Sequence, residues 1–260
     1  MIFLLNNGPG RFGNHIYNLF YLQTLSKISG HSIWIRKSNY LNDYFDIKTK
    51  GNDSKSYFKR FKILTNRNLT SDLDLKFNYI LKPPLLGDHF FSFIKELDFE
   101  IKNKFSVGRI DDSFFNVAIH FRGGDFKSWD KNSILDIEYY QRSLDYVFKE
   151  HENIKLFVYT DDPKLESYIK FLDFLKIKQI TYSIGHLDKH FIYDFKEISE
   201  CDCIISSPST FCIWASVLGN KRKSIIHSEK WVNYRVNASD KFWHNMKGSG
   251  EKYYHKFYII

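Results

Sequence analysis

Apolar positions in the N-terminal part of the chain change their spacing along the sequence. Short apolar runs predict buried strands, and stretches with apolar residues at three- and four-residue steps predict helices. These patterns give strands at 2–5, 31–36 and 77–81 and helices at 14–29 and 89–105. Residues 43–76 follow neither period, and we assign no element to them.

A more regular alternation begins at residue 116. Alternating strands and helices indicate an α/β fold, with a parallel sheet covered by helices on both faces. Pro163 suits the first turn of its helix, where no backbone N–H is required. Ligands of such sheets bind beyond the carboxyl ends of the strands, so the residues after each strand are the functional candidates. The predicted strands are 116–121, 155–160, 179–183, 203–206 and 224–227, and the predicted helices are 137–149, 163–175, 191–200 and 211–218.

Composition narrows the classes of function. Hydrophobic residues make up 43% and charged residues 26%, as in an ordinary soluble globular protein. The net charge of +8 favours an anionic partner, but the basic residues are dispersed, which argues against nucleic-acid binding.

Cysteine usage and the apolar runs bear on the compartment. Cys201, Cys203 and Cys212 cannot all pair, which favours a reducing compartment. The N-terminal apolar run is too short for a signal peptide, and no apolar stretch has the length of a spanning helix. We therefore expect a cytoplasmic protein, with peripheral association at the cytoplasmic face of a membrane left open.

Two glycine-containing segments follow predicted strands. Residues 7–14 form a glycine-rich turn into a helix, which lets backbone amides approach an anion or a sugar, although the spacing is not GxGxxG. Residues 119–125 place His120 and Arg122 beside two glycines, where a guanidinium can hold phosphate oxygens through its fork of donors. The structural alternatives are a plain turn in the first segment and a surface salt bridge from Arg122 to Asp125 in the second.

Two further segments at strand ends carry carboxylates and hydroxyls. Asp161 and Asp162 follow the strand at 155–160, where they can cap the next helix or support a ligand. Residues 206–210 are a run of four hydroxyl side chains and a proline before a helix. Capping needs one hydroxyl, so the others are available to donate to a phosphate or a base.

Together these four segments resemble the fucosyltransferase superfamily, which includes bacterial alpha-1,2-fucosyltransferases, the alpha-1,6 enzymes and the protein O-fucosyltransferases. Residues 10–14 are similar to its GRFGN or GGLGNQ opening, and residues 120–125 to its HxRRxD motif. Residues 160–163 match its TDD(P) element, and residues 201–218 resemble the CxxxIIANSSFSWWGAWL segment of the alpha-1,2 enzymes. The four motifs occur in the family's order, which makes the set specific although each alone is weak.

The resemblance implies a fold and a reaction. The fold is GT-B, in which two Rossmann-like domains face a central cleft, and the reaction is an inverting transfer of fucose from GDP-fucose to a glycan hydroxyl. An N-terminal, acceptor-facing domain is expected at 1–112 and a donor-binding domain at 113–240, followed by an aromatic and basic tail at 241–260. The break is expected within the polar stretch 106–115.

The resemblance also implies roles for individual residues. Arg122 would bind the donor diphosphate and stabilise the leaving group, His120 would contact the same region, and Asp125 would order the loop or touch the sugar. The expected catalytic residues are Arg122, His120, Asp125 and Asn14. The expected substrate-binding residues are Arg11, Gly13, Asp161, Asp162, Ser209, Thr210 and Phe211, of which the last three would line the phosphate and nucleoside pocket.

The chain departs from the family pattern at a few positions. The second Arg of HxRRxD is Gly123, the last serine of SSFS is Cys212, and the first tryptophan after it is Ile213. These changes leave the linkage and the acceptor more open than the donor. The general base also stays open among His15, Asp125 and the acids of 43–76.

No metal or other cofactor is expected. A fixed guanidinium and helix-start amides can stabilise the departing diphosphate without a metal ion. The Asp-x-Asp pair of Asp72 and Asp74, which could suggest a magnesium or manganese site, follows no clear strand. Two other readings remain: a transferase of the same fold that uses another nucleotide sugar, and a non-catalytic protein that binds nucleotides or nucleic acid.

Overall fold

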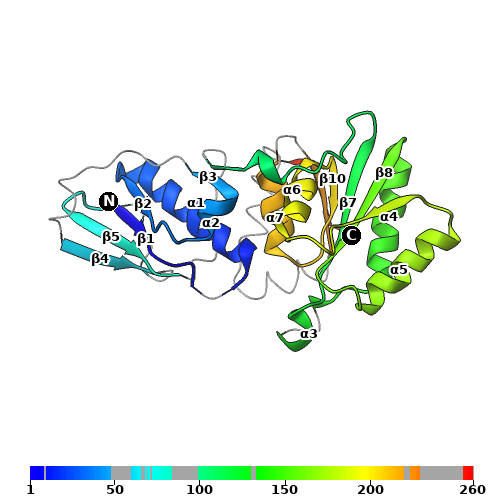
Figure 1. Ribbon diagram of the computed structural model, residues 1–260, viewed down its shortest axis with the longest axis horizontal. Helices are drawn as coiled ribbons and strands as arrows, with labels where there is room; N and C mark the ends of the chain where they lie inside the picture. The colour runs from blue at the N-terminus through cyan, green and yellow to red at the C-terminus, as the bar shows by residue number, and fades with distance from the viewer. Residues whose placement is uncertain are drawn as a thin grey trace. The chain divides into compact units, whose positions relative to one another are not determined.

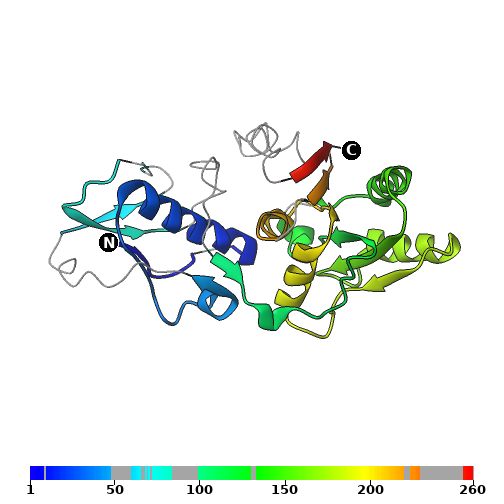
Figure 2. The same ribbon diagram turned by 90° about the horizontal axis from the view of Figure 1, so that it is seen from above.

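The computed structural model consists of two compact units, Met1–Lys102 and Asn103–Ile260 (Figures 1 and 2). The residues that it describes are 1–8, 10–47, 60–65, 68, 70, 72–83, 99–129, 133–219, 223–228 and 254–259. None of the helices in these ranges has both the length and the apolar character needed to cross a membrane. The division into 1–112, 113–240 and 241–260 and the GT-B arrangement stay predictions.

The N-terminal unit contains a parallel sheet with the strand order β2-β1-β5-β4. Its central strand β1 is fully buried, and α1 follows it directly. Gly30 ends α1 in the left-handed region at φ 72°, where glycine is the residue without a steric penalty. The bounds are β1 Ile2–Leu4, α1 Phe12–Ser29, β2 Ile33–Ile35, α2 Leu41–Tyr44, β4 Arg60–Leu64 and β5 Phe77–Leu81.

The helix predicted at 89–105 is wrong at its C-terminal end. Phe99–Ile101 is a strand, β6, and Asn103–Phe105 is a single 3₁₀ turn. β6 pairs antiparallel with β3, Phe45–Ile47, so contacts with a distant strand override the local helical spacing. Residues 89–98 of the predicted helix lie outside the described ranges.

The C-terminal unit holds a parallel sheet of six strands in the order β9-β8-β7-β10-β11-β12. Counted along this unit the order is 3-2-1-4-5-6, that of doubly wound nucleotide-binding folds, and its direction reverses between β7 and β10. The strands are β7 Phe115–Phe121, β8 Ile154–Thr160, β9 Tyr182–Ile184, β10 Cys203–Ile205, β11 Lys223–His227 and β12 Tyr254–Ile259, and the helices are α3 Phe126–Trp129, α4 Ile137–Glu150, α5 Glu166–Ile177, α6 Ile192–Glu200 and α7 Thr210–Val217.

Helices cover both faces of this sheet (Figure 1). Val117, Ile119 and Phe121 of β7 are fully buried and pack in one core with α4 and α5. Because side chains of a strand alternate between faces, His120 points the other way and contacts Phe211 of α7. The end of the buried strand therefore fixes the position of His120, and Arg122 follows two residues later.

Three predictions in this unit need correction. The strand predicted at 179–183 lies at Tyr182–Ile184, because residues 179–180 still close the end of α5, where the Ile180 N–H donates to the Leu175 carbonyl at 2.9 Å. The helix predicted from Pro163 begins at Glu166, because the backbone first makes a turn in which the Leu165 N–H donates to the Asp162 carbonyl at 3.0 Å. Part of the predicted C-terminal tail is the strand β12, which pairs in parallel with β11. Residues 241–253 of that tail lie outside the described ranges.

Candidate active site

Arg122 follows β7 and is held between two carboxylates. Its Nη1 lies 2.7 Å from Oδ2 of Asp161, and its Nη2 lies 2.7 Å from Oδ1 of Asp125. The guanidinium carbon also lies 5.0 Å from the centre of the Phe126 ring. These contacts fix the orientation of Arg122, and 12% of its side chain is exposed. The structural alternative of a salt bridge to Asp125 is therefore present, as part of a larger cluster.

Asp161 connects two neighbouring strand ends. It follows β8, and its Oδ1 accepts hydrogen bonds from the backbone N–H groups of Gly123 at 2.8 Å and Gly124 at 3.3 Å. Its other oxygen binds Arg122. One carboxylate therefore fixes both the guanidinium and the turn that follows it.

Gly123 packs closely against the turn after β8, where a side chain would force its neighbours to shift. A Cβ atom there would lie 3.0 Å from Cδ1 of Leu165 and 3.1 Å from Oδ2 of Asp162. Gly123 stands at the position of the second Arg of the HxRRxD motif, and its backbone lies close to the turn after β8. This approach brings the Asp161 carboxylate within reach of the Gly123 amide.

Asp162 follows Asp161 in the same turn but has different partners. Its carboxylate forms an ion pair with Lys127 and accepts a hydrogen bond from the Lys164 N–H at 3.1 Å. These contacts, the Lys127 hydrogen bond first, lower the pKa of Asp162 against the opposing effect of burial. Asp162 therefore links α3 to the residues before α5. In the described part of the chain it forms no hydrogen bond or ion pair with Arg122.

His120 is buried behind Arg122. Its Nδ1 lies 2.7 Å from Oγ of Ser207, and its ring stacks on Phe211 with centroids 5.6 Å apart. Burial lowers the pKa of His120 to about 4, with Asp161 raising it and Arg122 lowering it. At neutral pH the ring is uncharged, so it can offer a substrate a hydrogen bond but not a positive charge.

The hydroxyl run at the end of β10 divides into two parts. Ser209 caps α7, because its side chain accepts a hydrogen bond from the Phe211 N–H at 3.2 Å. Ser206 and Ser207 are buried beneath it. Thr210 and Phe211 open the helix, so the N-terminal end of α7 begins at the strand next to β7. This is the switch point of the sheet, where nucleotide phosphates bind in folds of this order.

The site residues fall into two groups. Arg122, Asp125, Asp161 and the α7 start lie at the carboxyl ends of β7, β8 and β10, as predicted for the C-terminal unit. Arg11, Gly13 and Asn14 belong to the N-terminal unit, at the start of α1 after β1. Gly10 leaves no room for a Cβ beside the Asn14 amide, which would lie 2.7 Å away.

Sequence reasoning missed Ser207 and Lys127. Ser207 stands inside the hydroxyl run, and its contact with His120 across 87 positions has no local signal. Lys127 lies on α3, a four-residue helix that the pattern of apolar residues does not predict.

Replacing Ser207 with alanine should destabilise the protein by about 1–3 kcal/mol, because the buried His120 ring loses its hydrogen bond at Nδ1. The melting temperature should fall accordingly. In a His120→Phe background the same substitution should cost clearly less, since the shared contact is already absent. Equal losses in both backgrounds would mean that Ser207 does not act through His120.

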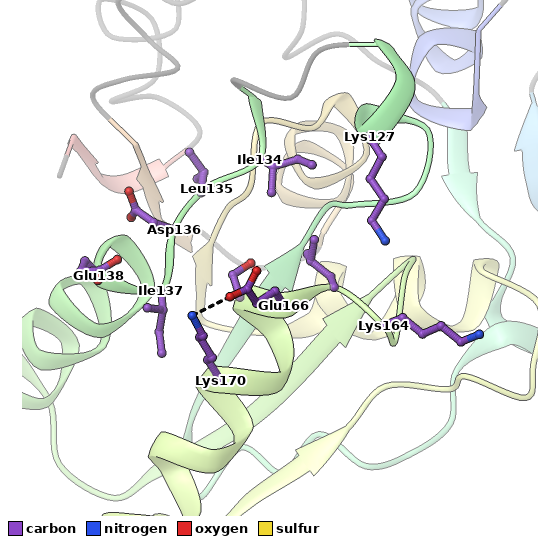
Figure 3. A pocket seen from close by; sticks show the side chains of 11 residues that line it. Lys127, Ile134, Leu135, Asp136, Ile137, Glu138, Lys164, Glu166 and Lys170 are labelled. Carbon is purple, nitrogen blue, oxygen red and sulfur yellow. Dashed lines mark ion pairs between the residues drawn. The ribbon is translucent and has the colours of Figure 1, made fainter.

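A cavity of about 590 Å³ lies beside the site, between the starts of α4 and α5 (Figure 3). Lys127 reaches it from α3, and an ion pair between Glu166 and Lys170, 2.6 Å long, lies at its edge. Its wall includes Leu165, whose side chain also lies close to Gly123.

Carboxylates in the described part of the chain do not gather into a metal site. No group of three or more His, Cys, Asp or Glu side chains there has the arrangement of metal ligands. Asp74 accepts a hydrogen bond from the Lys76 N–H at 2.8 Å, which places it in a turn before β5. Independence of metal stays a prediction.

Comparisons with known proteins identify a matching family, a related sequence and a similar fold. Residues 86–247 match the model of glycosyl transferase family 11. A galactoside 2-alpha-L-fucosyltransferase of Caenorhabditis elegans is 24% identical over 198 residues, which are 72% of this chain and 49% of the relative. The chain thus spans about half the length of this curated relative. The crystal structure of POFUT1 in complex with GDP has a TM-score of 0.54 and 11% identity over 86% of this chain and 97% of that one, which shows a shared fold.

Proposed function

The chain belongs to glycosyl transferase family 11, and we propose that it transfers fucose from GDP-fucose to a hydroxyl group of a glycan, with inversion at the anomeric carbon. The observation that carries the proposal is Arg122, which Asp161 holds at the end of β7, next to the point where the strand order of this doubly wound sheet reverses. A galactoside acceptor and an alpha-1,2 linkage are the finer proposal. They are supported by the relative's name and by the hydroxyl segment before α7.

Arg122 would act on the leaving group. Negative charge grows on the diphosphate as the bond to the sugar breaks, and a preorganised guanidinium lowers the energy of that state. A diphosphate would replace Asp125 at the guanidinium, because Asp125 is 40% exposed and Asp161 is 20% exposed. Asp161 would stay in place and keep the Arg122 fork in the geometry that binds two oxygens.

The other site residues would complete the substrate contacts. The start of α7, with Thr210 and Phe211, would face the phosphates and nucleoside, where helix amides favour negative charge. The neutral His120 would add a hydrogen bond. Arg11, Gly13 and Asn14 would serve the sugar and acceptor side. A cytoplasmic site of action is part of the same proposal.

The donor is tested by nucleotide release. The protein is incubated with GDP-fucose, GDP-mannose, UDP-glucose and UDP-galactose, with lactose as acceptor, and free GDP and UDP are measured. Release of GDP from GDP-fucose alone supports the proposal. Release of UDP would favour a transferase for another nucleotide sugar. Tight, salt-dependent oligonucleotide binding without release from any donor would favour a non-catalytic role.

Removal of divalent metal should leave turnover unchanged. We expect EDTA to have no effect, because Arg122 and helix amides can supply the positive charge that a metal ion supplies elsewhere. Turnover with GDP-fucose is compared in EDTA, in magnesium and in manganese. Complete loss in EDTA with recovery in magnesium or manganese would contradict this expectation.

A further inference from the structure

A histidine and a tyrosine form a pair at the carboxyl edge of the N-terminal sheet. His15 lies in the first turn of α1, after β1, and Tyr40 precedes α2, after β2. Nδ1 of His15 is hydrogen-bonded to the Tyr40 hydroxyl. The two rings meet edge to face, with centroids 5.6 Å apart and planes at 68°. Both side chains are partly exposed, so a ligand can approach the pair.

The surroundings of His15 act on the pKa of its ring and on the hydrogen bonding of its two nitrogens. The carbonyls of Gly8 and Gly10 interact favourably with the protonated ring and raise its pKa, although burial, the larger effect, lowers it. Nε2 is buried and has no hydrogen-bond partner among the described residues. A proton on Nε2, the nitrogen that does not contact Tyr40, leaves Nδ1 as the acceptor of the Tyr40 O–H.

Other contacts hold the two loops together. The amides of Asn7 and Asn39 exchange hydrogen bonds of 2.9 and 3.1 Å, so the loop after β1 is fixed to the turn after β2. Tyr40 also packs edge to face on Tyr44, with centroids 5.8 Å apart. The nearest charged group on α2 is Asp43, which acts on Tyr44. The pair is therefore preorganised, and no carboxylate in the described part of the chain is hydrogen-bonded to the His15 ring.

We propose that Tyr40 and His15 form a proton relay that activates the acceptor hydroxyl. Tyr40 Oη takes the proton of that hydroxyl while its own proton passes to His15 Nδ1. The acceptor oxygen uses its electron pair to form the glycosidic bond, and the electrons of the broken bond leave with GDP. The proton ends on His15 as an imidazolium, which the Gly8 and Gly10 carbonyls stabilise, and is later lost to water. This inference rests on the proposed function.

Three variants separate the relay from a structural role. Tyr40→Phe keeps the ring and removes the hydroxyl, and His15→Gln keeps an acceptor for the Tyr40 O–H but cannot take up a proton. Tyr44→Phe removes a hydroxyl from the neighbouring ring and is the matched control. We measure transfer from GDP-fucose to lactose, GDP release in water alone, GDP affinity and melting temperature.

We expect Tyr40→Phe and His15→Gln to lower turnover by about 100-fold or more, the usual contribution of general-base catalysis. GDP affinity should stay unchanged, and Tyr44→Phe should keep the wild-type rate. In the wild type, kcat/KM should fall as the pH drops through the pKa of His15, which lies below its usual value because of burial. This acid limb should disappear in His15→Gln.

Two results would overturn the relay. Normal turnover in His15→Gln, or equal losses in Tyr40→Phe and Tyr44→Phe, would mean that the pair only supports the loops. A wild-type protein that transfers fucose while either result holds would reject the relay and leave the proposed function intact. A wild-type protein that neither transfers fucose nor releases GDP would reject both.

Discussion

Replacing Arg122 with alanine should lower turnover by about 100-fold or more, as expected when a preorganised donor to a developing anion is removed. The guanidinium is oriented by Asp161 and Asp125 before any substrate arrives, so no rearrangement is needed as charge grows on GDP. GDP affinity should fall as well, because the same group would bind the diphosphate in the ground state. Turnover, GDP affinity and melting temperature are measured on the same samples.

Two further variants define what Arg122 does. Arg122→Lys should recover little, because lysine keeps the charge but lacks the planar fork. Arg142→Ala, on the exposed side of α4, is the matched arginine control and should behave as wild type. If Arg122 served only as a salt bridge, its loss would leave catalysis intact. Near-normal turnover in a folded Arg122→Ala protein would therefore contradict the site assignment.

Asp161→Asn should lower turnover by about 10–100-fold, because loss of orientation at a reacting group costs up to that factor. Its carboxylate holds Arg122 through one oxygen and the Gly123 and Gly124 amides through the other. The asparagine side chain would present an N–H₂ group to the guanidinium or to the amides, and either arrangement loses a contact. Steady-state kinetics should show the loss mainly in kcat.

Asp162→Asn is the matched control, since it changes the adjacent carboxylate in the same way. Its partner Lys127 is 49% exposed, and pairs of this kind contribute about 0–1 kcal/mol. We expect turnover close to wild type and a small fall in melting temperature. Equal losses of turnover in Asp161→Asn and Asp162→Asn would show that the two residues are not distinguished by their contact with Arg122.

The pattern of apolar residues predicted the C-terminal sheet well. Its central strands β7, β8 and β10 are mostly buried, so continuous apolar runs such as Val117–Ile119 mark them without any knowledge of partners. The strand ends follow from the same pattern, and parallel pairing then brings Arg122 and Asp161 together at one edge. The contact between these two residues is thus a consequence of the register between β7 and β8. That register becomes predictable from the sequence only once a parallel sheet is assumed.

Other features depended on contacts that no local pattern contains. β6 forms because Phe99–Ile101 pairs with β3, more than fifty residues earlier in the chain. The start of α5 shifts from Pro163 to Glu166 because residues 162–165 form a turn, and Leu165 of that turn packs against Gly123. The His120–Ser207 and His15–Tyr40 contacts join residues that are 87 and 25 positions apart in the sequence, so the residue types alone did not identify them.

The most direct test is analysis of the product formed from GDP-β-L-fucose and lactose. Nuclear magnetic resonance of the purified trisaccharide reports both the anomeric configuration of fucose and the hydroxyl that it occupies. Inverting transfer predicts an α-linked fucose, on the 2-hydroxyl of galactose if the finer proposal holds, with GDP released in equal amount. A β-linked product would contradict the inverting mechanism, and the absence of any fucosylated product from this or other glycan acceptors would contradict the proposed function itself.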